Sequence, residues 1–436
     1  MSRRFVASLA GILVAANFVF AQDPQDQPAP TDEPAPVPHA GVAEPAGSVA
    51  DGPLSSIFGN FTPERRGVVT AEAEFMLWFV SNAGQTLPIS AADIFGVTGL
   101  GDLSGVENGK GPVSGGRFTF GYWQIEDNPW VPGGIRDRGG EARFFFVGSR
   151  SGDISTTVPA TLFRPFFDLN DRTINGFLVA APGLATGGIN AHAQLDMWGA
   201  EANFWKNVYF NKPGTTTSID VMAGFRYLNA NTGVEINSVS AFSPTIPAGP
   251  GGTPSPFAGF AGNQLSVLDS FATHNNFYGG QVGIAAKTWF ADNLMSLEGS
   301  LRIALGTTSE DLTIAGSQVR TFANGTTAVS NGGLLALPSN IGNHHFSQFA
   351  QVPELEFKFV YPVGNHLKFS TGVSALYWSK VLRAADQIDR SIDITQIPNF
   401  PLPPGTTPTG LTAPGVPFTQ SALWVVGLSL GVEVKW

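Results

Sequence analysis

The last fifteen residues of the chain alternate between apolar and polar side chains. Every even position from Trp424 to Trp436 is aromatic or aliphatic, and most odd positions between them are small or charged. Successive side chains of a strand point to opposite faces, so this pattern predicts a β-strand. Crossing a bilayer takes about 9–11 tilted residues, which this strand would supply. An edge strand of a secreted β-sandwich is the alternative that one strand leaves open.

The same alternation recurs along the chain. It predicts nine further strands, at 68–80, 115–125, 140–149, 190–206, 216–229, 276–290, 294–306, 346–361 and 366–378. Within 190–206 the phase of the pattern shifts near Trp198, which would fit a β-bulge. Two more segments, 233–241 and 265–273, would pair with each other as extra strands. The predicted count is therefore ten, with twelve as the alternative.

The connections between these strands alternate in length. Long connections cover 81–113, 151–189, 231–267, 307–345 and 380–417, and short ones cover 127–138, 207–215, 291–293 and 362–365. A soluble sandwich has no reason to place every long loop at one end. The fold we predict is all-β: a transmembrane antiparallel up-and-down β-barrel of about 10–12 strands, with short periplasmic turns and long extracellular loops.

The N-terminus predicts export. Residues 1–21 carry Arg3 and Arg4, then an apolar run, then a small residue at Ala21, as in a cleaved secretory signal peptide. Residues 22–60 are rich in Pro, Ala and acidic side chains, a composition that predicts a disordered linker. The predicted barrel domain is 61–436, and the predicted location is the bacterial outer membrane.

Composition narrows the partners and the chemistry. The chain has 436 residues, a formal net charge of -10, 13% charged residues and no Cys. Its acidic balance argues against a nucleic-acid partner. The absence of Cys removes disulfides and thiolate chemistry. The expected partner is outer-membrane lipid, and oligomerisation is left open.

Aromatic residues gather near the ends of the predicted strands. Such rings prefer the membrane interface and predict two girdles. The candidates are Trp78, Trp123, Trp130, Trp205, Tyr209, Trp289, Phe290, Trp378, Trp424 and Trp436.

Several segments, in order along the chain, resemble one family. They are AEFMLWFV (73–80), RPFFD (164–168), WGAEANF (198–204), AGFRYL (223–228), NFYGGQVG (276–283), VPELEF (352–357) and ALYWSKVLRAADQIDR (375–390). Together they are similar to the seventh class of beta-barrel porins of the bacterial outer membrane. The resemblance implies an outer-membrane porin and brings no substrate and no catalytic residue. The aromatic C-terminus likewise resembles the signal by which barrel assembly machinery recognises a last strand, here ending at Trp436.

The sequence offers little catalytic or metal-binding chemistry. No metalloprotease, nucleophile-elbow or phosphate-loop motif occurs. We therefore predict no catalytic residue, no cofactor and no metal site, and a solvated loop is the favoured interpretation of His344–His345. Arg164 and Asp168 predict a loop folded inward and pinned by lumen charges. Asp386, Asp389 and Arg390 predict a cluster that anchors a loop.

Charged residues on the polar faces of the predicted strands are the candidate pore lining. They are Glu72, Glu74, Arg117, Glu141, Arg143, Arg226, Lys287, Glu298, Arg302, Glu354, Glu356 and Lys358. Charges of both signs would set the ion preference of a water-filled pore. Alternatively they pair and fill the barrel, because open channels need roughly 16 strands.

These observations predict a porin-like passive channel for ions or small hydrophilic solutes, and not an enzyme. The alternative is a non-conducting structural or surface-interaction barrel that acts through its extracellular loops, such as the Gly/Pro/Thr-rich segment 243–259. A barrel hydrolase is the third and least favoured hypothesis.

Overall fold

A computed structural model describes most of the chain. The described residues are 66–81, 91–92, 111–126, 135–156, 161–211, 216–290, 295–402, 407, 410 and 412–436. The chain divides into two units, Met1–Gly59 and Asn60–Trp436, and the described residues all belong to the second. The signal peptide and linker predicted for 1–60 lie outside the described residues.

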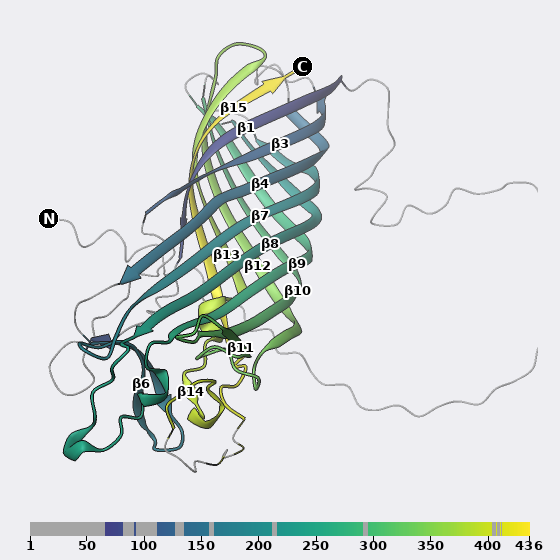
Figure 1. Ribbon diagram of the computed structural model, residues 1–436. Coiled ribbons are helices and arrows are strands. Elements are labelled where there is room, and N and C mark those ends of the chain that lie inside the picture. The colour runs from purple at the N-terminus through teal and green to yellow at the C-terminus, as the bar shows by residue number, and fades with distance from the viewer. Residues whose placement is uncertain are drawn as a thin grey trace, which may run out of the picture. The chain divides into compact units, whose positions relative to one another are not determined.

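Ten long antiparallel strands form a closed ring (Figure 1). The ring closes because β1 pairs with both β3 and β15, and β10 pairs with both β9 and β12. In ring order the strands are β1 (Arg66–Val80), β3 (Val113–Glu126), β4 (Ile135–Thr156), β7 (Ala185–Asn211), β8 (Thr216–Phe242), β9 (Gln264–Phe290), β10 (Met295–Thr321), β12 (Gly342–Pro362), β13 (Leu367–Leu382) and β15 (Gln420–Lys435). A closed sheet leaves no edge facing lipid, which is what a membrane-spanning sheet requires.

The two ends of this barrel differ. Each strand is antiparallel to its neighbours, so the short connections 127–134, 212–215, 291–294 and 363–366 share one end, called here the short-turn end. The longer connections share the other, the long-loop end. The C-terminus belongs to the short-turn end, where the Trp436 backbone N–H donates to the Val69 carbonyl over 3.1 Å. The predicted alternation of connections is confirmed.

The alternative count of twelve strands is wrong. The segments 233–241 and 265–273 do pair, with Gly233 opposite Ala272 and Val239 opposite Ser266. They are continuations of β8 and β9 and not new strands, because the register runs unbroken into the membrane part. The residues that face inward also have even numbers along the whole of β8 and odd numbers along the whole of β9.

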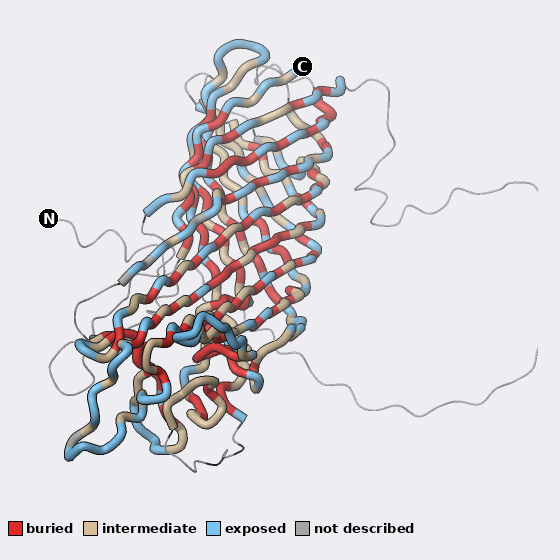
Figure 2. Tube along the Cα trace, viewed as in Figure 1, coloured by how far each residue is buried: buried red, intermediate tan, exposed pale blue. Residues whose placement is uncertain are grey.

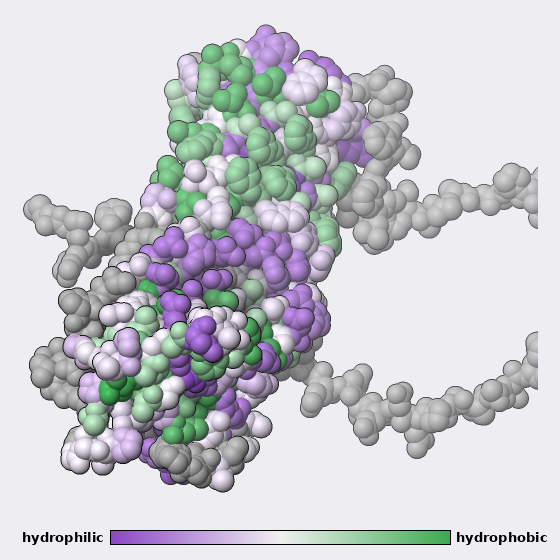
Figure 3. All heavy atoms as spheres, viewed as in Figure 1, coloured by the Kyte–Doolittle hydropathy of each residue, from purple (hydrophilic) through white to green (hydrophobic). Residues whose placement is uncertain are grey.

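The apolar face of the longest strands, β7, β8, β9 and β10, changes sides part-way along. On β8 the outward face carries Val221 and Phe225 near the short-turn end, but Glu235 further along. Figure 2 shows buried and exposed positions alternating along the barrel strands. The inward face changes in the opposite sense, from Arg226 to Ile236. The part near the short turns therefore suits lipid outside and polar groups inside, and the extension suits water outside and an apolar core inside. Figure 3 shows the apolar wall near the short-turn end and a hydrophilic zone beyond it.

This inversion explains the apparent phase shift near Trp198. The inward positions of β7 stay odd on both sides of this residue, from Leu195 to Glu201. β7 itself keeps its register with β8 at Trp198, and that register shifts only between Asn207 and Tyr209. The irregularity near Trp198 lies on β4, whose register with β7 shifts between Val147 and Arg150, opposite Met197 and Leu195. What changes at Trp198 is the medium outside the barrel wall, from lipid to water. The odd residues of β7 still face inward, but beyond this point they are the apolar ones.

Aromatic side chains mark both borders of the apolar wall. Toward the long loops, Trp198 and Tyr227 lie 5.0 Å apart between ring centroids, and Tyr377 and Trp424 lie 4.6 Å apart. At the other border Trp436 is exposed. From Trp424 to Trp436 the strand covers roughly 40 Å at about 3.4 Å per residue. At a tilt of about 45° this becomes about 28 Å, close to the roughly 25 Å of a barrel's apolar band.

Five members of the predicted girdle are wrong, because they face the interior. Trp78, Trp123, Trp205 and Trp378 are buried and point inward. Trp289 lines an interior cavity. Trp130 lies outside the described residues. Tyr209, Phe290, Trp424 and Trp436 are exposed, as a girdle requires. The prediction used only how close each residue lies to a strand end. Whether a residue faces lipid or the interior depends on the alternation of side chains along its strand.

The long connections fold into the extended end of the barrel. β5 (Leu162–Asp168) and β6 (Thr173–Ala180) form a hairpin that β2 (Ala91–Ala92) and β14 (Ser391–Ile392) join in a small sheet. Short 3-10 turns, η1 (Pro250–Gly252), η2 (Ala258–Phe260), η3 (Ala384–Gln387) and η4 (Ile394–Gln396), and the strand β11 (Thr327–Asn331) complete this end. Their apolar side chains pack against the inward faces of the strand extensions. We call the hairpin 162–180 and the segment 332–341 the loop plug.

Within the described part of the chain, no helix has the length and apolar character to span a membrane.

Candidate functional site

All twelve predicted pore-lining residues lie on inward faces of the barrel strands. Alternation along each strand fixes this orientation, because their sequence neighbours point outward. Most of them are brought together at one depth. Glu72, Glu74, Arg117, Glu141, Arg143, Arg226, Arg302, Glu354, Glu356 and Lys358, together with Glu201, form what we call the charged layer. A pore-lining role for these residues stays a prediction.

Arg117 illustrates how closely the charged layer is paired. Its Nε donates to Glu74 Oε2 over 2.5 Å, and its Nη2 donates to Glu356 Oε1 over 2.5 Å. Lys358 Nζ lies 3.0 Å from Glu72 and 3.1 Å from Glu74. Charge-assisted bonds of this kind are the strong ones among hydrogen bonds, and they fix the long side chains across the lumen.

Glu354 and Glu356 on β12 are shared by arginines from several strands. Arg143 Nη1 on β4 reaches Glu356 Oε2 over 3.2 Å, and Arg302 Nη1 on β10 reaches the same oxygen over 3.1 Å. Arg226 on β8 is paired with Glu354. β4 and β12 stand on opposite sides of the ring of ten strands. The Arg143–Glu356 pair therefore spans the lumen.

Glu201 is a member of this layer that the sequence analysis missed. It accepts a hydrogen bond from Arg226 Nη2 over 2.9 Å and another from Gln281 Nε2 over 2.6 Å. The sequence does contain the pattern that places Glu201 on the inward face, because Gly199, Glu201 and Asn203 alternate with apolar residues. The supposed phase shift at Trp198 hid it.

An apolar layer lies directly behind the charged layer, toward the long loops. Described residues from nine barrel strands contribute buried side chains, and Val113 of β3 packs against them. The rings of Phe277 and Trp378 are 6.1 Å apart, and those of Trp78 and Phe145 are 5.9 Å apart. The members are Met76, Trp78, Val80, Phe145, Val147, Leu195, Met197, Leu228, Ala230, Phe277, Ala304, Ala350, Val352, Leu376, Trp378, Val381, Leu423 and Val425. We call this set the apolar layer.

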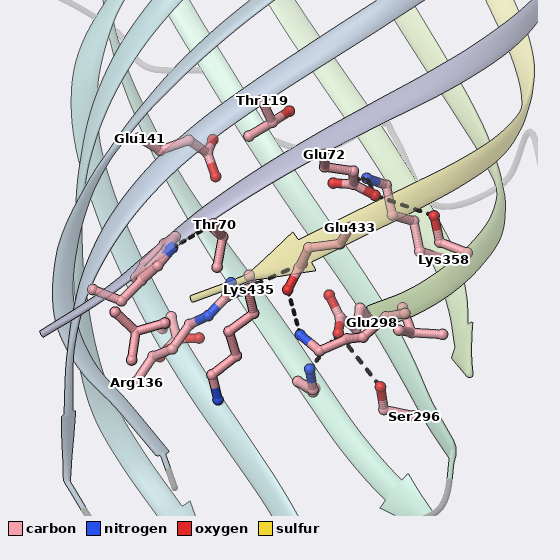
Figure 4. Close-up of a pocket in the computed structure, with 18 of the residues that line it drawn as sticks. Thr70, Glu72, Thr119, Arg136, Glu141, Ser296, Glu298, Lys358, Glu433 and Lys435 are labelled. Atoms are coloured by element: carbon pink, nitrogen blue, oxygen red, sulfur yellow. Dashed lines mark hydrogen bonds and ion pairs between the residues drawn. The ribbon is translucent and has the colours of Figure 1, made fainter. Parts of the chain in front are cut away.

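On the other side of the charged layer lies a cavity of 1270 Å³. It reaches to the short-turn end, where Lys435 and the turn residues Gly364–His366 line it (Figure 4). Lys287 Nζ and Glu298 Oε1, the two predicted lumen residues outside the charged layer, pair over 2.5 Å near this end. We call this cavity the vestibule.

The loop plug is held by one buried carboxylate. Asp269 Oδ1 on β9 accepts hydrogen bonds from the backbone N–H groups of Leu334, Leu335 and Ala336, each 2.8–2.9 Å long. Its Oδ2 accepts a bond of 2.5 Å from Arg164 of β5. The predicted inward loop is confirmed for Arg164.

Asp168, the other end of the RPFFD segment, does not reach the barrel wall. It accepts hydrogen bonds from the Asn170 backbone and the Asn175 side chain, which belong to its own hairpin.

The predicted loop anchor at 386–390 works through hydrogen bonds. Asp386 accepts from Ser421 Oγ, and Asp389 accepts from the Gly415 backbone. Burial raises the pKa of the Asp386 carboxyl above its ordinary value, more than the Ser421 bond and Arg383 lower it. Burial lowers the pKa of Arg383.

The histidine pair predicted to lie in a solvated loop is part of a strand. β12 begins at Gly342, and His345 Nδ1 lies 2.8 Å from Asp311 Oδ1 on the outer wall. His344 Nε2 lies 3.0 Å from the Asn340 carbonyl oxygen. Among the residues that the structure describes, no group of three or more His, Asp or Glu side chains is arranged to hold a metal ion.

A family model described as "Putative beta barrel porin-7 (BBP7)" matches residues 71–436, which is the barrel from the middle of β1 onward. The chain belongs to this beta barrel porin-7 family. This barrel porin-7 chain is therefore an outer-membrane β-barrel protein, as the resemblance implied. No curated protein matches its sequence.

Solved structures similar to this porin-7 chain are also from outer-membrane proteins. The outer membrane protease OmpT from Escherichia coli matches at 8% identity and a TM-score of 0.39, over 86% of this chain and 98% of that one. The outer-membrane expressed OmpT of Vibrio cholerae matches at 8% identity and a TM-score of 0.18, over 85% and 98%. A TodX mutant, titled a monoaromatic hydrocarbon channel, matches at 6% and 0.18, over 86% and 91%.

The prediction that the chain is not an enzyme is corrected by this comparison. One of the similar structures is a protease, so the lack of a known sequence motif does not exclude enzymatic activity in such a barrel. At this identity and TM-score the likeness carries no argument for a protease site in this chain.

Proposed function

We propose that this outer-membrane barrel is closed to passive diffusion in the state described, and that it acts through its long-loop end. Barrels of this kind keep short turns in the periplasm and long loops outside the cell. The vestibule would then open to the periplasm, and the loop plug would face the exterior. This is the non-conducting alternative of the sequence analysis.

The observation that supports closure best is the ion pair across the lumen. Arg143 and Glu356 meet at 3.2 Å from opposite sides of the ring, so no solute-sized space separates them. The apolar layer behind this pair adds a second obstacle, because an ion crossing it would lose its hydration without gaining a polar partner. A ring of ten strands is close in size to small barrels whose interiors are filled by side chains.

The long-loop end offers the larger structured surface. The strand extensions carry the loop plug as a core-packed cap, and several apolar side chains of this cap remain exposed. Phe167 on β5 and Ile174 on β6 are 39% and 63% exposed. A well-ordered cap with apolar groups in water suits contact with another molecule better than conduction does.

A porin-like channel is the second candidate. The family description favours it, and so does the vestibule, which already provides a wet entrance. For conduction the charged layer, the apolar layer and the loop plug would all have to move aside.

Conductance in planar bilayers separates the two candidates. We expect no steps from the wild-type protein, and none from a Phe277→Ala/Trp378→Ala variant, because the charged layer and the loop plug stay in place when the apolar layer loses these two rings. The recordings need a protease-protection control that shows the barrel inserted. Regular, long-lived steps from the wild type would favour the porin.

Export is part of this proposal. We propose that residues 1–21 are removed as a signal peptide, that 22–60 serves as a linker, and that barrel assembly machinery recognises the last strand ending at Trp436. In support, the backbone of Trp436 bonds to Val69, so the terminal residue belongs to the closing seam of the barrel.

A further inference from the structure

The side chains of the vestibule have a net charge opposite to that of the whole protein. Eight Lys and Arg side chains and six Asp and Glu side chains line it, an excess of two positive side chains, whereas the chain carries a net charge of -10. The low-dielectric barrel wall around the vestibule focuses this potential on a molecule that enters it.

The positive excess lies at the entrance. Arg66, Arg136, Lys287, Lys368 and Lys435 all stand within four residues of the short-turn ends of their strands. Figure 4 shows Arg136 and Lys435 directed into this space. The Arg136 guanidinium stacks over the Trp123 ring at 4.2 Å, which holds the cation in place through cation–π attraction.

Fewer acids accompany these cations. Glu433 is shared by Arg136, at 3.5 Å, and by Lys368. Glu298 pairs with Lys287, and Asp220 accepts a hydrogen bond of 2.7 Å from Asn207 Nδ2. Deeper in the vestibule, the acids and bases of the charged layer that line it are equal in number. An entering molecule therefore meets positive charge first.

The floor of the vestibule has hydrogen-bond donors without acceptors. Trp205 Nε1 and Arg302 Nε are buried and have no hydrogen-bond partner among the described residues. The two groups are neighbours, because the Arg302 guanidinium lies 5.7 Å from the Trp205 ring. Indole and guanidinium N–H groups can only donate, so a molecule that completes this floor must carry acceptor oxygens.

From these observations we propose that the vestibule is a binding site for a small oligo-anion with carboxylate or phosphate groups, which enters from the short-turn end. Negative groups would meet Arg136 and the entrance lysines, and an acceptor oxygen would reach Trp205 and Arg302. The charged layer closes the far side, so the site binds this solute without passing it. The proposal goes beyond the closed barrel and holds whether or not the barrel conducts.

Calorimetric titration of the full-length protein in neutral detergent tests this site. The probes are citrate, for carboxylates, and inorganic pyrophosphate, for phosphates, with sucrose as the uncharged comparison. We expect at least one of the two anions to bind, binding to weaken as salt is added, and no binding of sucrose. Whichever anion binds more tightly identifies the preferred group.

Two variants and one control connect this binding to the vestibule. Arg136→Gln leaves Glu433 paired with Lys368 and should weaken anion binding about tenfold. Trp205→Phe keeps the ring and removes the unpartnered N–H, and it should weaken binding severalfold without changing the salt dependence. Lys206→Gln removes a cation from the same end of the barrel but outside the vestibule, where it pairs with Asp137 over 2.7 Å, and should bind like the wild type.

The proposal is overturned if neither anion binds at millimolar concentration, if sucrose binds as tightly, or if Lys206→Gln weakens binding as much as Arg136→Gln. These outcomes would leave the closed barrel untouched, because conductance tests that separately.

Discussion

A single carboxylate, Asp269, joins the barrel wall to both parts of the loop plug. It is fully buried, and its four hydrogen bonds come from three backbone N–H groups and from Arg164. A buried charge is tolerated only when it is paired in this way. Asp269 lies in 265–273, a segment for which the sequence left the number of strands open, so no pattern marked it as important.

We predict that Asp269→Asn loosens the loop plug while the membrane barrel stays intact. The amide would place its NH₂ group against the Arg164 guanidinium and leave a buried cation unpaired, at a cost of about 3–5 kcal/mol. Hydrogen exchange of residues 332–341 is the measurement, and it should become at least a hundredfold faster. Asp311→Asn is the matched control, because Asp311 is half-exposed on the outer wall. Equal exchange in both variants would show that Asp269 does not hold the plug.

Asp386 gives the loop 383–392 a predicted pH dependence. Burial raises the pKa of its carboxyl in the folded protein above the ordinary value of 3.8. The folded state then holds this proton more tightly than the unfolded chain does. Stability from this group is therefore present below 3.8 and falls as the pH rises through the raised folded pKa.

We expect Asp386→Asn to remove the loss of stability of the loop 383–392 as the pH rises. Hydrogen exchange of 383–392 between about pH 4 and pH 7, corrected for intrinsic rates, should vary less with pH in the variant than in the wild type. Asp171→Asn, at an exposed position, serves as the control. Identical pH profiles for Asp386→Asn and the wild type would contradict the assignment.

At the scale of elements, the reversal of polarity along the longest strands, β7, β8, β9 and β10, organises the barrel. β8 keeps one parity from end to end, yet its outward face changes from Phe225 to Glu235 as the surroundings change from lipid to water. The lateral girdle of Trp198 and Tyr227 marks the border. The part of β8 near the short turns thus forms the wall of a membrane barrel, and its extension forms the wall of a barrel surrounded by water.

This reversal predicts different costs for one substitution at two places on the same face. Phe225→Arg would put a charge in the apolar band and should lower the free energy of unfolding by about 2–4 kcal/mol. Glu235→Arg, on the outward face of the same strand beyond the border, should cost less than about 0.5 kcal/mol. Urea unfolding from lipid vesicles measures both. Comparable losses would mean that the border lies elsewhere.

The barrel strands could be predicted from the sequence because alternation has period 2 wherever one face is apolar. The same logic placed all twelve predicted lumen residues on the inward face. It failed where the polarity of both faces changed together, at Trp198. It also assigned most of the extensions of β8 and β9 to a long connection, and the alternative count made 233–241 and 265–273 separate strands. The sequence could not reveal which inward charges meet, because Arg143 and Glu356 are joined only by closure of the ring.

At the scale of the whole molecule, the lumen is divided into three zones. The vestibule opens at the short-turn end, the charged and apolar layers cross the middle, and the loop plug fills the extended end. The family is named for porins, but in this member the side chains that would line a pore meet one another. The division also separates the two proposed surfaces, an anion site facing one side and a structured cap facing the other.

The charged layer should be expensive to disrupt. Arg226→Met would leave Glu201 and Glu354 without this cation in a buried setting and should cost about 3–5 kcal/mol in vesicle unfolding experiments. Lys206→Met, at a partly exposed pair with Asp137, should cost less than about 1 kcal/mol. If the two variants were equally stable, water would fill the lumen around these charges.

Substituted-cysteine labelling from the two sides tests closure of the lumen most directly, because the natural chain has no Cys. Ser300 lines the vestibule, and Ala304 belongs to the apolar layer on the same inward face of β10. A membrane-impermeant maleimide should label Ser300→Cys readily and leave Ala304→Cys unlabelled in inserted, folded protein. Equal labelling rates at the two positions would show that water passes through the barrel and would contradict the closed lumen.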